Sequence, residues 1–422
     1  MNGDENPGHP TLENLSLAVT KWVEQGTGRP LARWLRGELD ADGVPIGLAI
    51  PDWHRCLAIL AAGRRQAGDW PSECNAAIAG LVLATLRFAR PDGSPAMHAV
   101  GAGPNPPSWA PADWATWYRG TGIARVLRWW FAPTRTDTMA PPLPAWSARD
   151  RVLATLRPDW RPDGDFLAVD HRDAQSPCRF ELRGAGRTWL GPEWREELTG
   201  AGGPISRPRP ARWVSRSSAD LVEWTYRVDG LRMTRSALLL RGRHLALLSI
   251  LAEGPEAAWG AEPTMRLAMP PDVEAGPIEQ SRALVLAEPG HRGAAQAIPL
   301  ALPCLPYPTE RGSFRATEHE LVLRQKPDGR RCWLPVLVSW DNDRHRKPLS
   351  WRILTVSEKS RVVPSDRAFA ARVSWGRNET YVVYRSLGPP ASRAFLGYQT
   401  GARFLLGEFD TDGNLKPVFT VE

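Results

Sequence analysis

Aromatic and basic side chains gather in residues 109–119, and together they have the chemistry to bind sugars. The segment contains Trp109, Trp114, Trp117, Tyr118 and Arg119. Flat aromatic faces with polar edges stack on sugar rings, and an arginine beside them can pair with a sulfate or a carboxylate. At helical spacing the same stripe is also typical of core packing. Trp109, in a proline-rich loop, is the best candidate for a sugar platform, with Trp114 and Arg119 as further candidate ligand-binding residues.

A second group of ionisable residues lies in the segment 340–348 (WDNDRHRKP). Asp341, Asp343 and His345 have the side chains of metal ligands. Arg344 and Arg346 alternate with them, and such alternation is typical of an exposed, charge-balanced loop. We therefore expect no metal at this segment.

Other signatures of cofactor or metal chemistry are missing from the sequence. The five cysteines are odd in number and far apart, which argues against a disulfide framework and against a zinc site. The sequence contains no G-x-S-x-G, P-loop, H-E-x-x-H or dinucleotide-binding motif. We expect no cofactor.

Composition and charge limit the class of partner. The chain has 422 residues, 42% of them hydrophobic and 23% charged, and a formal net charge of +7. This charge favours an anionic partner such as an acidic polysaccharide, but the arginines are spread out and form no basic stripe typical of nucleic-acid binding. The longest apolar run, residues 76–86, is too short to cross a membrane. Residues 1–10 do not resemble a secretory signal, so we expect a cytoplasmic protein that binds neither nucleic acid nor membrane. The sequence leaves the oligomeric state open.

The period of the apolar residues changes along the chain and predicts two domains. Residues 11–130 follow a helical period and predict about four helices in antiparallel pairs, within a helical domain at 1–132. The first helix should end at Gly26 and Pro30, the second should follow Pro51 with Asp52 as its cap, and the fourth should run on from Asp113. Prolines predict a linker at 133–147, and residues 148–422, with many short period-two segments, predict an antiparallel β-sandwich. The expected fold class is α+β.

The clearest strands lie at residues 221–251. Two runs of alternating apolar residues flank Asp229-Gly230, a pair that suits a tight hairpin turn. Arg241-Gly242 supplies a second turn, and the run 244–251 (HLALLSIL) is apolar enough for a strand covered on both faces. We expect a three-stranded meander around which the sandwich is built.

Three segments resemble polysaccharide lyases of the heparinase II/III kind. Residues 163–190 (DGDFLAVDHRDAQSPCRFELRGAGRTWL) are similar to the strand, loop and strand pair of that family's β domain. Residues 212–253 are similar to the part that follows, and residues 86–95 (LRFARPDGSP) resemble a helix end with the D-G-S loop beside the lyase cleft. The resemblance implies a helical α/α toroid, here partial, followed by a β-sandwich. It also implies an acidic polysaccharide as partner.

The resemblance also implies a chemistry, β-elimination on a uronic acid. A base removes the proton beside the carboxylate, a cation or donor neutralises the carboxylate, and an acid serves the leaving oxygen. His98 and Tyr118 are the candidate base and acid, and His171 with Arg172 is the candidate carboxylate clamp. The ordinary alternatives are a surface or hydrogen-bonded role for each histidine and helix packing for Tyr118.

Two departures from the family pattern decide between the hypotheses. The family carries a His-x-His-x-Asp type of motif in the loop that corresponds to residues 170–178, where this chain has a single histidine, His171. The family's toroid is also longer than the helical part available here. We therefore favour a heparinase-like protein that binds acidic polysaccharide with a reduced or absent lyase site. The alternatives are an active lyase and a non-catalytic platform for a partner protein.

Overall fold

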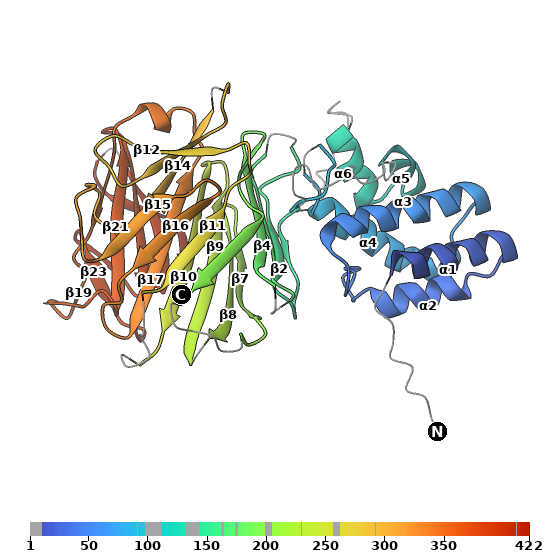
Figure 1. Ribbon diagram of the computed structural model, residues 1–422, viewed down its shortest axis with the longest axis horizontal. Helices are drawn as coiled ribbons and strands as arrows, with labels where there is room; N and C mark the ends of the chain where they lie inside the picture. The colour runs from blue at the N-terminus through green and yellow to red at the C-terminus, as the bar shows by residue number, and fades with distance from the viewer. Residues whose placement is uncertain are drawn as a thin grey trace. The chain divides into compact units, whose positions relative to one another are not determined.

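The computed structural model describes residues 11–90, 92–97, 111–131, 143–161, 164–173, 176–198, 205–228, 230–255, 262–291, 293–410 and 412–422. Contacts within the chain divide it into two compact units, residues 1–146 with 159–164, and residues 147–158 with 165–422. The first unit is helical and the second consists of antiparallel sheets, which is the expected α+β layout (Figure 1). The predicted linker at 133–147 falls largely outside the described residues.

The described part of the first unit contains six α-helices and a 3-10 turn, more than the four predicted. They are α1 (Leu12–Gln25), α2 (Arg29–Glu38), α3 (Ile50–Ala67), η1 (Ser72–Cys74), α4 (Asn75–Arg87), α5 (Pro111–Trp117) and α6 (Gly122–Phe131). Helix α1 packs against α2 and α3, α3 packs against α4, and α5 packs against α6.

Local signals explain the ends of these helices and two errors of prediction. Thr11 caps α1 by accepting a hydrogen bond from the backbone of Asn14, and Gly26 ends the helix at φ +68°. Pro30 was expected only to end a helix, but it lies in the first turn of α2, where its missing N–H costs nothing. Similarly, Asp52 lies inside the first turn of α3 and does not cap it.

The predicted fourth helix is two helices. Gly120 adopts φ +84° between α5 and α6, a conformation that breaks a helix. The aromatic residues at 114–118 and the apolar residues at 123–127 therefore belong to different helices.

Gly43 and Gly80 allow a turn to lie directly against α4. A Cβ added at Gly43, where φ is +78°, would lie 2.3 Å from the carbonyl carbon of Gly80. We expect Gly43→Ala to lower the free energy of unfolding by about 1–3 kcal/mol, because backbone atoms cannot move aside. Urea denaturation measures the effect. Gly37→Ala, in α2 with nothing within 4 Å of the added Cβ, is the control and should be neutral or stabilising. If the two substitutions change the free energy of unfolding equally, the close contact between Gly43 and Gly80 is not the cause.

The second unit contains four sheets, whose strands from β2 onward pair antiparallel. The first sheet contains β1 (Trp146–Ser147), β2 (Leu153–Leu156), β3 (Phe166–Asp170), β4 (Cys178–Gly184), β5 (Arg187–Leu190), β6 (Glu193–Glu197), β11 (Thr264–Ala268), β15 (Gly312–Ala316) and β16 (Glu320–Gln325). The central sheet has the order β12 (Glu274–Pro277), β13 (Leu284–Ala287), β14 (Ala294–Pro299), β17 (Arg331–Ser339), β10 (Leu245–Glu253), β9 (Leu231–Leu240), β8 (Ala219–Val228), β7 (Arg209–Ser215).

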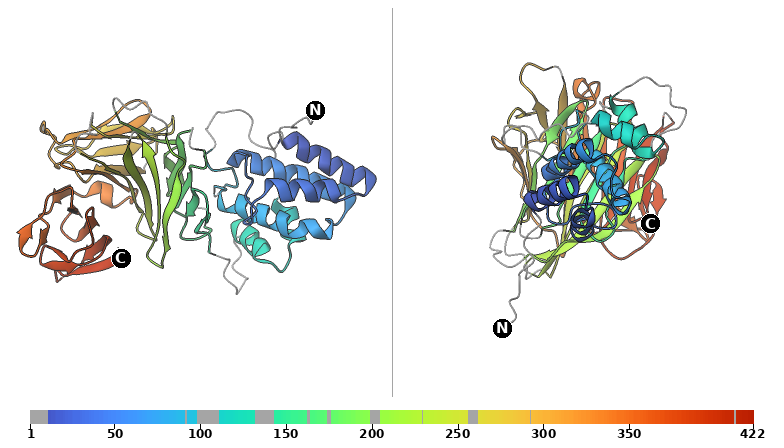
Figure 2. Two further views of the ribbon diagram at one scale, coloured as in Figure 1. Left: turned by 90° about the horizontal axis from the view of Figure 1, so that it is seen from below. Right: turned by 90° about the vertical axis from the view of Figure 1, so that its right-hand side faces the viewer.

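The third and fourth sheets belong to the C-terminal part, drawn in orange and red in Figure 2. The third has the order β18 (Leu349–Ile353), β21 (Ala368–Trp375), β22 (Glu379–Ser386), β25 (Phe404–Phe409), β26 (Leu415–Val421). The fourth has the order β20 (Arg361–Val362), β19 (Ser357–Glu358), β23 (Arg393–Phe395), β24 (Tyr398–Thr400). A 3-10 turn, η3 (Arg344–Arg346), precedes β18.

Three apolar cores separate the four sheets. Buried residues of the first and central sheets form one core, those of the central and third sheets form a second, and those of the third and fourth form a third. Both faces of the central sheet therefore contribute to an apolar core. Strand β10 shows this directly, because Leu248 and Ile250 point into the first core and Leu247 and Leu251 into the second.

The predicted meander is confirmed. Strands β8, β9 and β10 lie side by side in the central sheet, with Val228 paired to Leu231 and Leu240 paired to Leu245 (Figure 1). Gly230 adopts φ +79° at the first turn and Gly242 adopts φ +66° at the second. Local turn chemistry and apolar alternation were sufficient to place these strands.

Candidate functional site

His171 follows β3 directly and points into the protein, where its side chain is only 5% exposed. The indole N–H of Trp224, on β8, donates to His171 Nδ1 at 3.1 Å. A guanidinium nitrogen of Arg235, on β9, lies 3.5 Å from the same Nδ1 atom. The ring of Tyr226 packs edge-on against the imidazole, with 5.7 Å between ring centroids.

These contacts fix the protonation of His171. An indole N–H can only donate, so Nδ1 is the acceptor and the ring proton lies on Nε2. Burial, together with the positive charge of Arg235, lowers the pKa of His171 to about 2. The imidazole is therefore neutral near pH 7, and the nitrogen that would accept a proton is already occupied. His171 can donate a hydrogen bond through Nε2, but it is poorly suited to act as a general base.

Arg235 and Glu196 form a buried ion pair between two sheets. The Arg235 side chain, 1% exposed, donates from β9 to the carboxylate of Glu196 on β6. Three aromatic rings surround the guanidinium, with centroids 5.0, 5.8 and 5.5 Å from its central carbon, and they belong to Trp194, Trp224 and Tyr226. The charge is thus compensated by one carboxylate and three ring faces inside the first core.

Sequence reasoning missed this cluster, although a signal for it was present. Arg235 has the same parity on β9 as Met233, Ala237 and Leu239, which all belong to the first core. A charged residue at an inward-facing strand position indicates a buried ion pair.

Arg172 does not join His171 in a carboxylate clamp. Its guanidinium forms a two-pronged contact with Asp170, with Nε and Nη2 at 2.9 and 2.8 Å from the two carboxylate oxygens. The imidazole of His171 meanwhile contacts Trp224 and Arg235. The two neighbouring side chains therefore have different partners, and the clamp stays a prediction.

In the helical unit, Trp114 packs in the core and offers no sugar platform. It has no exposed surface, and its ring stacks with Trp70 and Tyr118, at centroid distances of 6.1 Å in both cases. Trp117 meets the ring of Trp114 edge-on at 5.0 Å. The alternative reading of the aromatic stripe, helix packing, describes Trp114 correctly.

Tyr118 and Arg119 have different environments. Burial raises the pKa of Tyr118 to about 12, and its hydroxyl has no hydrogen-bond partner among the described residues. The phenol therefore stays protonated near pH 7, as the candidate role of acid requires, and it is poorly suited to act as a base. Arg119 is exposed and stays a candidate for binding an anion. Candidate residues His98 and Trp109 lie outside the described residues.

Solved structures of known proteins match nearly the whole chain. Heparan sulfate lyase HepC from Pedobacter heparinus aligns with 92% of it, with a TM-score of 0.62 and 13% identity. The heparinase III-BT4657 gene product aligns with 94% (TM-score 0.61, 10% identity), and a crystal structure of heparinase III with 91% (TM-score 0.62, 11% identity). The chain has a heparinase-like fold. It spans 66–68% of the length of these three proteins.

The sequence itself carries no closer match. No family model matches the chain, and no curated protein matches it. The likeness is therefore one of fold, and the residues of the site have to be judged by their own geometry.

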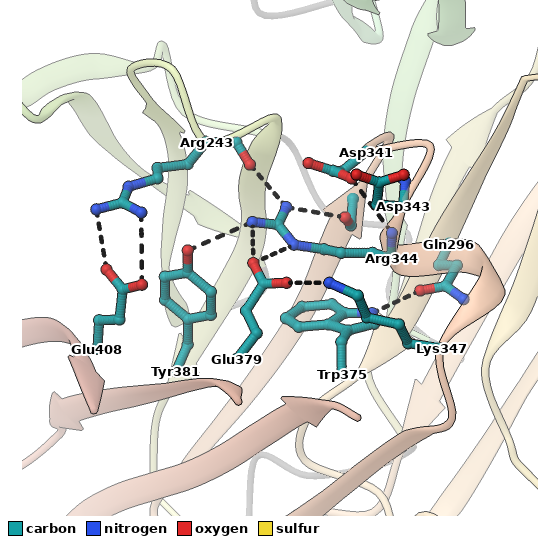
Figure 3. A network of polar contacts seen from close by, with 11 residues as sticks. Arg243, Gln296, Asp341, Asp343, Arg344, Lys347, Trp375, Glu379, Tyr381 and Glu408 are labelled. Carbon is teal, nitrogen blue, oxygen red and sulfur yellow. Dashed lines mark hydrogen bonds and ion pairs between the residues drawn. The ribbon is translucent and has the colours of Figure 1, made fainter. Parts of the chain in front are cut away.

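Within the heparinase-like fold, the segment 340–348 joins the central and third sheets, and most of its residues are exposed, as expected, although Arg344 is buried. Arg344 is 3% exposed, and its guanidinium donates to Glu379 at 2.7 Å and to the backbone carbonyl of Arg243 at 2.6 Å (Figure 3). The guanidinium also lies over the rings of Trp375 and Tyr381. The expectation of an exposed loop is wrong for Arg344, because the arginine has a carboxylate partner on β22.

Asp341, in the same segment, forms hydrogen bonds with the backbone. Asp341 accepts hydrogen bonds from the backbone N–H groups of Asp343 and Arg344, at 2.8 and 3.2 Å, which stabilises the turn at η3. Within the described ranges, no group of three or more His, Cys, Asp or Glu side chains could hold a metal ion. In the same part of the chain, no helix has both the length and the apolar character to cross a membrane.

Proposed function

We propose that this chain is a heparinase-like protein that binds acidic polysaccharide and has a reduced or absent lyase site. The observation that carries the proposal is the state of His171, which is neutral and already hydrogen-bonded through Nδ1, in a fold shared with a heparan sulfate lyase. The formal net charge of +7 suits a sulfated or carboxylated partner.

His98, the candidate base, lies outside the described residues, and neither His171 nor Tyr118 is suited to replace it as the proton acceptor of β-elimination. Elimination requires a base for the proton beside the uronate carboxylate, and the pKa shifts of His171 and Tyr118 disfavour that role for both. Arg172 is held by Asp170. His98 belongs to the alternative of an active lyase, in which it would act with Tyr118 and His171.

The helical unit supports the same proposal. We infer that its helices correspond to part of an α/α toroid, because 91–94% of the chain aligns with heparinases and its described helices pack in neighbouring pairs. A partial toroid would supply fewer residues to a cleft, while the sheets would keep their surface for binding. Arg119 and Trp109 are the candidates that the helical part would contribute.

Binding to heparan sulfate is the direct test of the proposal. We expect the full chain to bind immobilised heparan sulfate more strongly than uncharged dextran, and increasing salt should weaken the binding because opposite charges are screened. Titration of soluble glycan, followed by calorimetry, gives the dissociation constant. In the same samples, absorbance of unsaturated uronate should not rise with time against glycosaminoglycans or alginate.

Two results would overturn the proposal in different directions. A rise in absorbance that disappears in Tyr118→Phe would indicate an active lyase. If the chain binds dextran and heparan sulfate equally, or binds neither, it has no preference for acidic polysaccharide. The remaining hypothesis would then be a non-catalytic platform for a partner protein.

A further inference from the structure

A polar groove opens between the central and third sheets, on the side of the central sheet that faces away from His171. Its volume is about 420 Å³, which is in the range of small-ligand sites. Strands β7 to β10 supply one wall, and β22, β25 and β26 with residues 387–390 supply the other. Leu221, Leu251 and Phe404, which belong to the second core, line its apolar part.

Charges at this groove do not balance. Five arginines and two glutamates line it, namely Arg212, Arg232, Arg331, Arg385, Arg403, Glu223 and Glu253. Five positive charges against two negative ones leave an excess of three positive charges on one small surface.

Glu223 is shared by two of these arginines. Arg385 donates to it at 2.8 Å, and Arg212 lies 3.5 Å from its other oxygen. Burial alone would raise the pKa of Glu223, but the charges of Arg385 and Arg212 and the hydrogen bond from Ser236 hold it below its ordinary value. The carboxylate therefore stays ionised and neutralises only one of the two guanidinium groups.

The other end of the groove repeats this arrangement. Glu253 accepts from Arg331 at 2.8 Å, and Arg232 lies 4.0 Å from its second oxygen. Arg403 is exposed, and its side chain has no ion pair or hydrogen bond with any residue that the structure describes. Arg232 and Arg403 are thus the two cations most available to an incoming anion.

A second pocket continues from the groove and offers uncharged hydrogen-bonding groups. Its volume is about 300 Å³, and Arg331 and Leu387 line both spaces. Trp333 and Gln325 line the pocket, and within the described chain the buried indole N–H of Trp333 and the buried amide oxygen of Gln325 have no hydrogen-bond partner. A buried donor and a buried acceptor without partners are costly, and a ligand with hydroxyl groups would satisfy both.

We propose that the arginine-lined groove and its adjoining pocket bind a short stretch of acidic sugar, which deepens and rests on the proposed function. Carboxylate or sulfate groups would pair with Arg232, Arg331 and Arg403. Sugar hydroxyls would meet Trp333 and Gln325. The excess of positive charge selects an anion, and the uncharged donor and acceptor select a hydroxyl-bearing ligand over a simple anion.

The test compares two pairs of arginine substitutions in the full chain. Arg232→Gln with Arg403→Gln removes two exposed charges from the groove. The control, Arg361→Gln with Arg377→Gln, removes two exposed charges of the same unit that do not line the groove. Circular dichroism and thermal unfolding confirm that both variants fold. Calorimetry then measures binding of a heparin-derived oligosaccharide and of an unsulfated alginate oligosaccharide.

We expect the groove variant to bind the heparin oligosaccharide about tenfold more weakly and the control variant to bind within about twofold of the unsubstituted chain. If the groove variant binds both oligosaccharides more weakly, the groove recognises carboxylates. If it binds only the heparin oligosaccharide more weakly, the groove recognises sulfates. If both variants bind like the unsubstituted chain, or if both weaken equally, the groove is not the site although the proposed function stands. If the unsubstituted chain binds neither oligosaccharide, the proposed function fails as well.

Discussion

Arg235→Leu is expected to lower the free energy of unfolding by about 3–5 kcal/mol, because it leaves Glu196 charged and unpaired between two sheets. The substitution also removes the cation that lies against three aromatic rings. Urea denaturation, followed by tryptophan fluorescence, measures the change, and Trp194 and Trp224 are two of the twenty tryptophans that contribute to the signal.

A second substitution separates the loss of the ion pair from the loss of packing. Arg235→Leu combined with Glu196→Leu should recover a large part of the stability, since no uncompensated charge remains. Arg232→Leu, on the same strand but 59% exposed, is the matched control and should change stability by less than about 1 kcal/mol. If the double variant is no more stable than Arg235→Leu alone, the buried charge is not the cause.

Acid is expected to destabilise the protein through His171. Its pKa is about 2 in the folded state and about 6.5 when unfolded, so the unfolded chain binds a proton that the folded chain excludes. The stability that His171 contributes is fully present above pH 6.5 and is lost as the pH falls towards 2. The slope is about 1.4 kcal/mol per pH unit, or about 2–3 kcal/mol between pH 6.5 and 4.5.

The measurement is the difference between two stability curves. His171→Asn keeps an acceptor near Nδ1 but cannot be protonated, so its stability should fall less steeply below pH 6.5 than that of the unsubstituted chain. His319→Asn changes a histidine that is 60% exposed and should leave the slope unchanged. Parallel curves for His171→Asn and the unsubstituted chain would show that His171 accepts its proton freely.

The pKa of His244 is shifted in the opposite direction to that of His171, so its contribution to stability changes over a different range of pH. Its hydrogen bond with Asp165 raises the pKa of His244 above its ordinary value. The stability that His244 contributes is present below about pH 6.5 and fades as the pH rises through the raised pKa. The two histidines therefore do not mask each other in the acid range.

Elements set by local chemistry could be predicted from the sequence. Alternating apolar residues and Gly-bearing turns placed β8, β9 and β10, and Gly26 ended α1 where expected. Pro30 misled the prediction because proline both ends helices and occupies their first turns. Residue type alone could not separate these two roles.

The partners within the polar clusters could not be predicted, because they are distant in the sequence. Glu196 precedes Arg235 by 39 positions, and Trp340 donates to Asp165 across 175 positions. The sequence showed that His171 lies in a loop after a strand, but it could not show that the side chain turns inward to Trp224. Likewise, Trp114 has the right ring for a sugar platform, and only the packing of Trp70 and Tyr118 against it reveals its place in a core.

The apolar packing on both faces of the central sheet limits how this chain can be shortened. A fragment that stopped at Trp340 would keep the meander but would lose the third and fourth sheets, leaving Leu238, Leu245 and Leu247 in contact with water. Such a continuous exposed apolar surface favours aggregation over independent folding. Residues 341–422 are therefore an integral part of the β-rich unit. A truncated variant of the chain should be cut before the first sheet and not between two sheets that share a core.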